Sequence, residues 1–158
     1  MTPWRKALFC LEIFALLPAT VLFGPLLWAG VFAGAILIWA ELFDSRTMAG
    51  SGWLTALGGS LLFLLIILSG IVGLVAAWGT LLGGAQTIRR NDSLRWPVRI
   101  SLVLGLSAAM YMLVSMLHTT ADFQGRDEWF MLLPPAMLVG AHQLYLLGKG
   151  NAPPDIAG

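Results

Sequence analysis

Long apolar runs separated by short polar segments dominate the hydropathy pattern of the chain. A helix rises about 1.5 Å per residue and the bilayer hydrocarbon is about 30 Å thick, so about 20 apolar residues span it. Four runs come close to or exceed this length, and they cover residues 7–40, 54–82, 98–117 and 129–147. The pattern predicts an all-α integral membrane protein, a four-transmembrane-helix bundle in one domain (1–148), followed by a flexible cytoplasmic tail (149–158).

The first run is too long for one straight crossing, since its residues would extend about 51 Å as a helix. Pro18 and Pro25 lie inside it, and a proline removes a backbone donor and kinks a helix. Two arrangements fit: an interfacial helix over residues 4–17 followed by a span over 19–40, or a single kinked helix that begins near Ala7. The length of the run and the acidic Glu12 within it are atypical of a cleaved signal peptide.

The positive charges between the runs predict the orientation. With the N-terminus inside, seven of the basic residues fall on the cytoplasmic side and two, Arg46 and Arg126, on the outer side. The seven are Arg5, Lys6, Arg89, Arg90, Arg95, Arg99 and Lys149. Because cytoplasmic loops carry an excess of Lys and Arg, we expect both termini to be cytoplasmic, in a bacterial-type inner membrane.

The composition narrows the class of protein further. Hydrophobic residues make up 58% of the chain and charged residues 11%, against about 25% charged in soluble domains. The net charge of +1 argues against binding of DNA or RNA, which needs a strongly basic face. The single cysteine, Cys10, cannot form an intramolecular disulfide, and we expect it to be a buried apolar side chain.

Pairs of small residues at four-residue spacing occur throughout the apolar runs. Membrane helices pack through such residues, so we expect these pairs to line the bundle interior, with dimerisation or docking as the alternative. The run 54–82 is the best candidate for the central packing helix. The sets are Gly30/Gly34, Ser69/Gly73/Ala77, Gly79/Gly83, Ser101/Gly105/Ala109 and Ala136/Gly140.

Glu12 is the most unusual polar position because ionisable groups within membrane segments are costly and are functional candidates. It lies about 9 Å beyond Lys6, and His142 lies about 10 Å before Lys149, so the two can share a depth near Gln143. Such a pair could relay protons or bind a cation. The alternative is that Glu12 reaches interfacial water or an arginine, and that His142 lies at the headgroup boundary.

Two further groups are candidates for contacts rather than for chemistry. Residues 89–96, between the second and third runs, are predicted to form a basic loop. Four basic residues in this loop or directly after it are expected to attract lipid headgroups or a partner: Arg89, Arg90, Arg95 and Arg99. His118 and Asp122, four residues apart, are candidate outer-loop contacts. Metal sites usually need three or four ligands, and the two histidines lie near opposite membrane faces, so we expect no metal and no cofactor.

No nucleophile elbow, phosphate-binding loop or zinc-protease motif occurs in the sequence. The preferred hypothesis is therefore a non-catalytic accessory, assembly or protective partner of another membrane component, embedded in the lipid bilayer. One alternative is a small oligomeric transporter or ion-conducting protein that uses Glu12. A second is a membrane enzyme acting on lipid or quinone.

Overall fold

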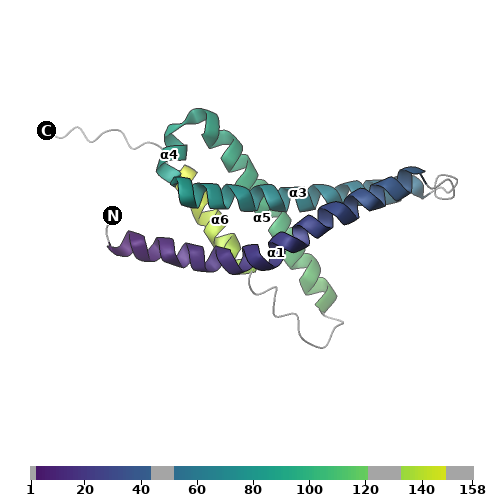
Figure 1. Ribbon diagram of the computed structural model, residues 1–158, viewed down its shortest axis with the longest axis horizontal. Coiled ribbons are helices and arrows are strands. Elements are labelled where there is room, and N and C mark those ends of the chain that lie inside the picture. The colour runs from purple at the N-terminus through teal and green to yellow at the C-terminus, as the bar shows by residue number, and fades with distance from the viewer. Residues whose placement is uncertain (1–2, 44–51, 121–132, 149–158) are drawn as a thin grey trace.

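The computed structural model describes residues 3–43, 52–120 and 133–148, and this part of the chain is helical apart from short connections. Its helices are α1 (Pro3–Phe43), α3 (Trp53–Gly83), α4 (Ala85–Arg90), α5 (Asp92–Thr120) and α6 (Leu133–Gly148). Figure 1 shows α1 and α3 running side by side, with α5 crossing them steeply and α6 slanting back across the first half of α1. The predicted tail, 149–158, lies outside the described residues.

Three helices are long and apolar enough to cross a membrane: α1, α3 and the Asp92–Ser115 part of α5. The chain therefore has the character of a membrane protein. The 16 described residues of α6 extend about 24 Å, which is shorter than the hydrocarbon core. A fourth crossing thus stays a prediction.

The first apolar run forms one continuous helix. α1 has 41 residues and contains both Pro18 and Pro25, so the separate interfacial helix over 4–17 is not observed. The helix changes direction near its middle, where the two prolines lie (Figure 1). Each proline removes one backbone hydrogen bond, which explains a bend without a break.

The prediction that the second run is the central packing helix is confirmed, because the two most extensive contacts between described helices are those of α3 with α5 and with α1. Its closest approach is to α5, at Gly73 and Gly105. A Cβ built on Gly73 would lie 2.2 Å from the Cα of Gly105, so two backbones touch at this crossing. Only glycine at both positions allows this distance.

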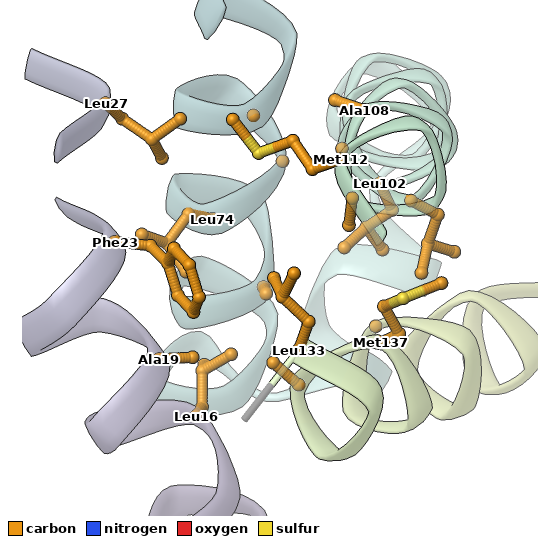
Figure 2. A pocket seen from close by; sticks show the side chains of 18 residues that line it. Leu16, Ala19, Phe23, Leu27, Leu74, Leu102, Ala108, Met112, Leu133 and Met137 are labelled. Atoms are coloured by element: carbon orange, nitrogen blue, oxygen red, sulfur yellow. The ribbon is translucent and has the colours of Figure 1, made fainter. Parts of the chain in front are cut away.

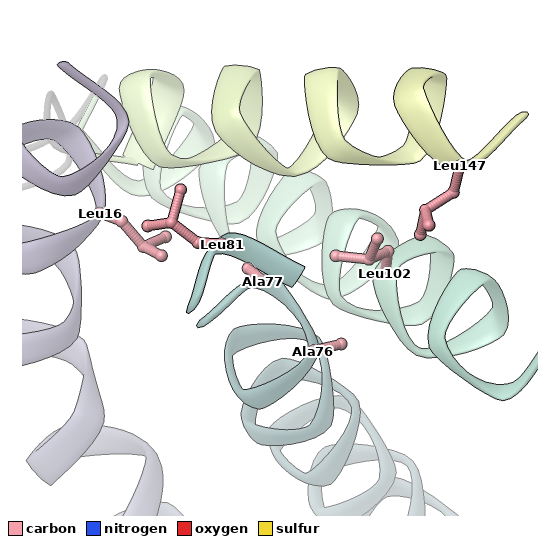
Figure 3. Packing of buried hydrophobic residues seen from close by; sticks show 6 residues of the cluster. All are labelled: Leu16, Ala76, Ala77, Leu81, Leu102 and Leu147. Atoms are coloured by element: carbon pink, nitrogen blue, oxygen red, sulfur yellow. The ribbon is translucent and has the colours of Figure 1, made fainter. Parts of the chain in front are cut away.

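Apolar side chains from four helices fill the interior near this crossing. Figure 3 shows the principal cluster, in which α3 contributes three residues to the core shared with α1, α5 and α6. Its members are Leu16, Ala76, Ala77, Leu81, Leu102 and Leu147. Small residues of α3 at this level let the larger leucines of its neighbours approach it.

The basic segment between the second and third runs is helical, whereas we predicted a loop. Gly84, with a φ of 77°, separates α3 from α4, because this left-handed conformation favours glycine. Asn91 alone separates α4 from α5, and its Oδ1 accepts a hydrogen bond from the backbone N–H of Ser93. Such a side-chain cap allows a helix to begin directly after another ends.

Two predictions about burial are wrong. Gly79 and Gly83 are exposed, and a Cβ built on either has no atom within 4 Å, so this pair does not line the interior. Cys10 is also exposed. The buried face of α1 carries Glu12, Leu16 and Ala19, and a residue two positions before Glu12 points to the opposite side at about 100° per residue.

Large apolar side chains cover the outer surfaces of the long helices. On α1 and α3 they include Phe14, Trp28, Phe32, Ile36, Trp39, Leu54, Leu65, Val75 and Leu82, each at least half exposed. In water such a surface would drive aggregation, whereas in lipid it costs nothing. The surface is what a protein surrounded by lipid presents.

Candidate functional site: a polar contact between α1 and α6

The first turns of α1 and the last turns of α6 lie against each other in opposite directions. Glu12 of α1 meets His142 of α6, while Ala19 and Phe23, farther along α1, pack on Leu133 at the beginning of α6. Glu12 lies on the same face of α1 as Leu16 and Ala19, since these positions are close to whole helical turns apart. Helix packing therefore directs the carboxylate into the bundle.

Glu12 has two hydrogen-bond partners, both on α6. Its Oε1 lies 2.5 Å from Nδ1 of His142, and its Oε2 accepts a hydrogen bond of 2.9 Å from Nε2 of Gln143. Because Glu12 and His142 lie 130 residues apart in sequence, the contact ties the two ends of the described chain together. We call these three side chains, Glu12, His142 and Gln143, the polar site.

The three side chains of the polar site differ in burial, so each can take part in different interactions. The Glu12 side chain is 10% exposed and that of His142 is 35% exposed. Gln143 is 3% exposed, and its Oε1 has no hydrogen-bond partner among the described residues. The site thus has a buried acid, a ring that reaches the surface of the bundle, and an unsatisfied buried acceptor.

The short contact requires a proton between Glu12 and His142, because a carboxylate oxygen and a bare ring nitrogen both only accept. The proton can reside on either group, and a second proton can bind Nε2 of His142. The pair therefore offers two positions for protons, the shared hydrogen bond and Nε2 of the ring.

A second polar contact joins α1 to α3, about two turns after Glu12 along α1. The indole Nε1 of Trp78 donates a hydrogen bond of 2.8 Å to Oγ1 of Thr20. Thr20 in turn donates to the backbone oxygen of Leu16, so the hydroxyl is satisfied on both sides. Sequence reasoning missed this contact, because nothing in the spacing of a lone threonine and a lone tryptophan indicates that they meet.

An apolar cavity of about 90 Å³ lies between the four long helices. Figure 2 shows its labelled side chains converging from α1, α3, α5 and α6. Leu16 lines it and lies one helical turn beyond Glu12, and Gly140 lines it and lies one turn before Gln143. The polar site therefore lies about one helical turn outside the cavity lining, and none of its three side chains lines the cavity. Sequence reasoning missed it, because voids arise from the fit between helices.

The basic residues predicted as headgroup or partner contacts gather around α4 and the beginning of α5. Arg89 and Arg90 occupy the last turn of α4, and the Arg99 guanidinium lies 5.1 Å from the centre of the Trp96 ring. Arg95 is half-buried, and its Nε is buried without a hydrogen-bond partner in the described part of the chain. Their binding role stays a prediction.

The outer-loop candidates are only partly described. His118 is exposed in the last turn of α5, while Asp122 lies outside the described residues. Within the described ranges, no three His, Cys, Asp or Glu side chains come together in a way that could hold a metal ion. The structure thus brings Glu12 and His142 together and leaves His118 apart from them.

Comparison with known proteins gives no family for this chain, since no family model, curated protein or solved structure matches it. The geometry of the polar site is therefore the basis for a functional proposal.

Proposed function

We propose that this chain is a small helical membrane protein that exchanges protons at the polar site and acts in transport as an oligomer. The observation that carries the proposal is the 2.5 Å contact between the buried Glu12 and His142. Acids and imidazoles within membrane segments are rare because they are costly to insert, and they mark proton relays and ion pathways. A purely apolar contact would join α1 to α6 at lower cost.

The proposal includes four crossings with both termini cytoplasmic, in a bacterial inner membrane. It is supported by α6 running opposite to the first half of α1, since neighbouring crossings of opposite direction return the chain to its starting side. The Arg and Lys bias supports the same orientation. Reporter fusions after residue 158 and in the segment 121–132 test it, and an exterior C-terminus would contradict it.

An oligomer is proposed because four helices offer few surfaces for a transport path. A second copy could contact the exposed small residues Gly79 and Gly83 of α3, whose surroundings are open in one copy. The homo-oligomer and the bilayer are then the partners that the chain requires.

Proton flux into pyranine-loaded vesicles that contain the purified protein tests the proposal. We expect Glu12→Gln to reduce the flux to that of empty vesicles, because an amide keeps the size of the side chain and cannot bind and release the proton. Glu41→Gln is the matched control, since it makes the same change near the other end of α1. Wild-type flux in the Glu12 variant would refute the proposal.

The accessory or assembly role is the second candidate, and one observation favours it. Gly79 and Gly83 form an exposed pair of small residues, which is the surface that another membrane helix can approach closely. In this case Gly79→Leu should abolish copurification with a membrane partner and lower the activity of that partner, while Glu12→Gln leaves both unchanged. Loss of proton flux in Glu12→Gln, with copurification of the partner unchanged, would favour proton exchange.

A further inference from the structure

The cavity between the four helices and the polar site next to it differ in what they can bind. The cavity lining is almost entirely aliphatic, with Leu16, Phe23, Leu102 and Met137 among its side chains. An apolar cavity stays dry, and one of roughly 150 Å³ takes up benzene. A void of about 90 Å³ is suited to a small ring or the end of an alkyl chain once its flexible leucines and methionines shift slightly.

The polar site, one helical turn beyond the cavity lining, offers hydrogen-bond acceptors. Gln143 is 3% exposed, and its Oε1 has no partner in the described part of the chain. A buried amide oxygen without a hydrogen bond costs free energy, so a donor that reaches it is favoured. Gly140 lies one turn before Gln143, and the space beside it holds the end of the Leu106 side chain, a flexible group that also lines the cavity and must shift to let a ligand reach Gln143.

The charge of the polar site determines which donor fits. When His142 is neutral, its Nδ1–H donates to an ionised Glu12, and the site then has one uncompensated negative charge. A buried charge without a partner is unfavourable. Two species can compensate the negative charge of Glu12: a proton on Nε2 of His142, or a cation beside the carboxylate.

We propose that the cavity and the polar site together bind a hydrophobic amine, with its apolar body in the cavity and its ammonium group at Glu12 and Oε1 of Gln143. This inference rests on the proposed proton exchange and names the class of molecule exchanged for the proton. An ammonium group donates up to three hydrogen bonds, which matches the acceptors of Gln143 and Glu12.

The exchange balances in protons and charge. Before binding, His142 carries protons on both ring nitrogens and its charge neutralises that of Glu12. When the ammonium ion arrives, the Nε2 proton leaves from the 35% exposed ring to the surroundings, and Nδ1 keeps its proton and its bond to Glu12. One cation replaces another, so ligand and proton compete for the same compensating position.

Calorimetry with three related probes tests the inference on the full chain in detergent. The probes are 2-phenylethylammonium, 2-phenylethanol and 3-phenylpropanoate, which share a ring and differ in charge. We expect the ammonium ion to bind about tenfold more tightly than the alcohol, because hydrogen bonds between charged groups are about twice as strong as neutral ones. We expect no binding of the carboxylate. Repeating the titration in buffers of different ionisation enthalpy should show proton release with the ammonium ion.

The variants separate the two parts of the binding site. Glu12→Gln should remove the preference for the ammonium ion while the alcohol still binds, which also shows that the cavity is intact. Ala136→Leu, which fills the cavity, should weaken both probes, and Glu41→Gln should change neither. Circular dichroism and gel filtration identify a variant that fails to fold.

Equal affinity for the ammonium ion and the alcohol, or an unchanged preference in Glu12→Gln, would overturn the inference. Binding without proton release would overturn the exchange. Proton flux that depends on Glu12 without any preference for the ammonium ion would refute the amine site and leave the proposed function standing. A preference that depends on Glu12 without flux would refute the proposed function instead.

Discussion

Replacing Gly73 by alanine tests the packing of the whole bundle, because this residue lies where α3 and α5 cross. The new Cβ would lie 2.2 Å from the Cα of Gly105 and 3.0 Å from its backbone nitrogen, whereas ordinary contacts begin at 3.4 Å. The difference between 3.4 and 2.2 Å requires the helices to separate by at least about 1.2 Å at the crossing. No rotamer can relieve the clash, since the atoms struck are backbone.

The magnitude follows from two opposing effects. Overpacking a well-packed interior costs about 1–3 kcal/mol, and a rigid backbone contact belongs at the upper end of that range. Alanine is favoured over glycine within a helix by about 0.5–1 kcal/mol. We therefore expect Gly73→Ala to lower the free energy of unfolding by about 2 kcal/mol, which combines the two effects.

Gly59→Ala, about four turns earlier in the same helix and outside the proposed contact with a second copy, is the matched control. A Cβ there has no atom within 4 Å, so only the helix preference acts and the variant should be stabilised by about 0.5–1 kcal/mol. Reversible unfolding in mixed micelles, followed by circular dichroism, measures both variants. Equal stability of the two variants would refute the reasoning, because the crossing of α3 and α5 would then have space for a Cβ that the structure does not show.

Three further predictions concern single side chains. Thr20→Val should destabilise the protein by about 1 kcal/mol, because it removes the acceptor of the Trp78 indole and interhelical hydrogen bonds in membranes average about 0.6 kcal/mol with a maximum near 1.7. Glu12→Ala should lower the free energy of unfolding by about 1–3 kcal/mol more than Glu12→Gln does. Alanine leaves the Gln143 amide without its acceptor, whereas glutamine at position 12 keeps a side-chain oxygen. Cys10 should react with N-ethylmaleimide in the folded protein in detergent, since its side chain is exposed about one turn from Lys6, and mass spectrometry measures the modification.

Each of these three predictions would be contradicted by a specific result. Unfolding of Thr20→Val at the wild-type midpoint would show that the Trp78 indole finds another partner. Equal stability of the two Glu12 variants would show that the polar site does not hold α1 to α6. Modification of Cys10 only after denaturation would contradict the position of its side chain on α1.

Much of the fold follows from hydropathy and from the positions of proline and glycine. The length of the apolar runs predicts the long helices, and the predicted 54–82 agrees with the observed Trp53–Gly83, whereas α5 begins at Asp92, before the predicted 98. The helical course of the chain on both sides of Asn91 was not predicted. A run of charges is typical of a loop, and the helix depends on a single capping side chain and one left-handed glycine.

Depth along the membrane normal could be estimated from sequence, and it placed Glu12 near His142 and Gln143. Whether these side chains touch could not be predicted from sequence. Contact depends on which faces of α1 and α6 turn toward each other, and rotation about a helix axis leaves the depth of a residue unchanged. The same reason explains Gly73 and Gly79. Both belong to small pairs at identical spacing, yet the first touches another backbone and the second faces outward.

The sequence by itself determined that this chain forms long apolar helices, because the free energy of burying backbone and side chains in lipid depends on local composition. Only the tertiary structure decided the partners of Glu12, the crossing at Gly105 and the cavity beside the polar site. These depend on helix rotation and crossing angle, which arise from the packing of all the helices together.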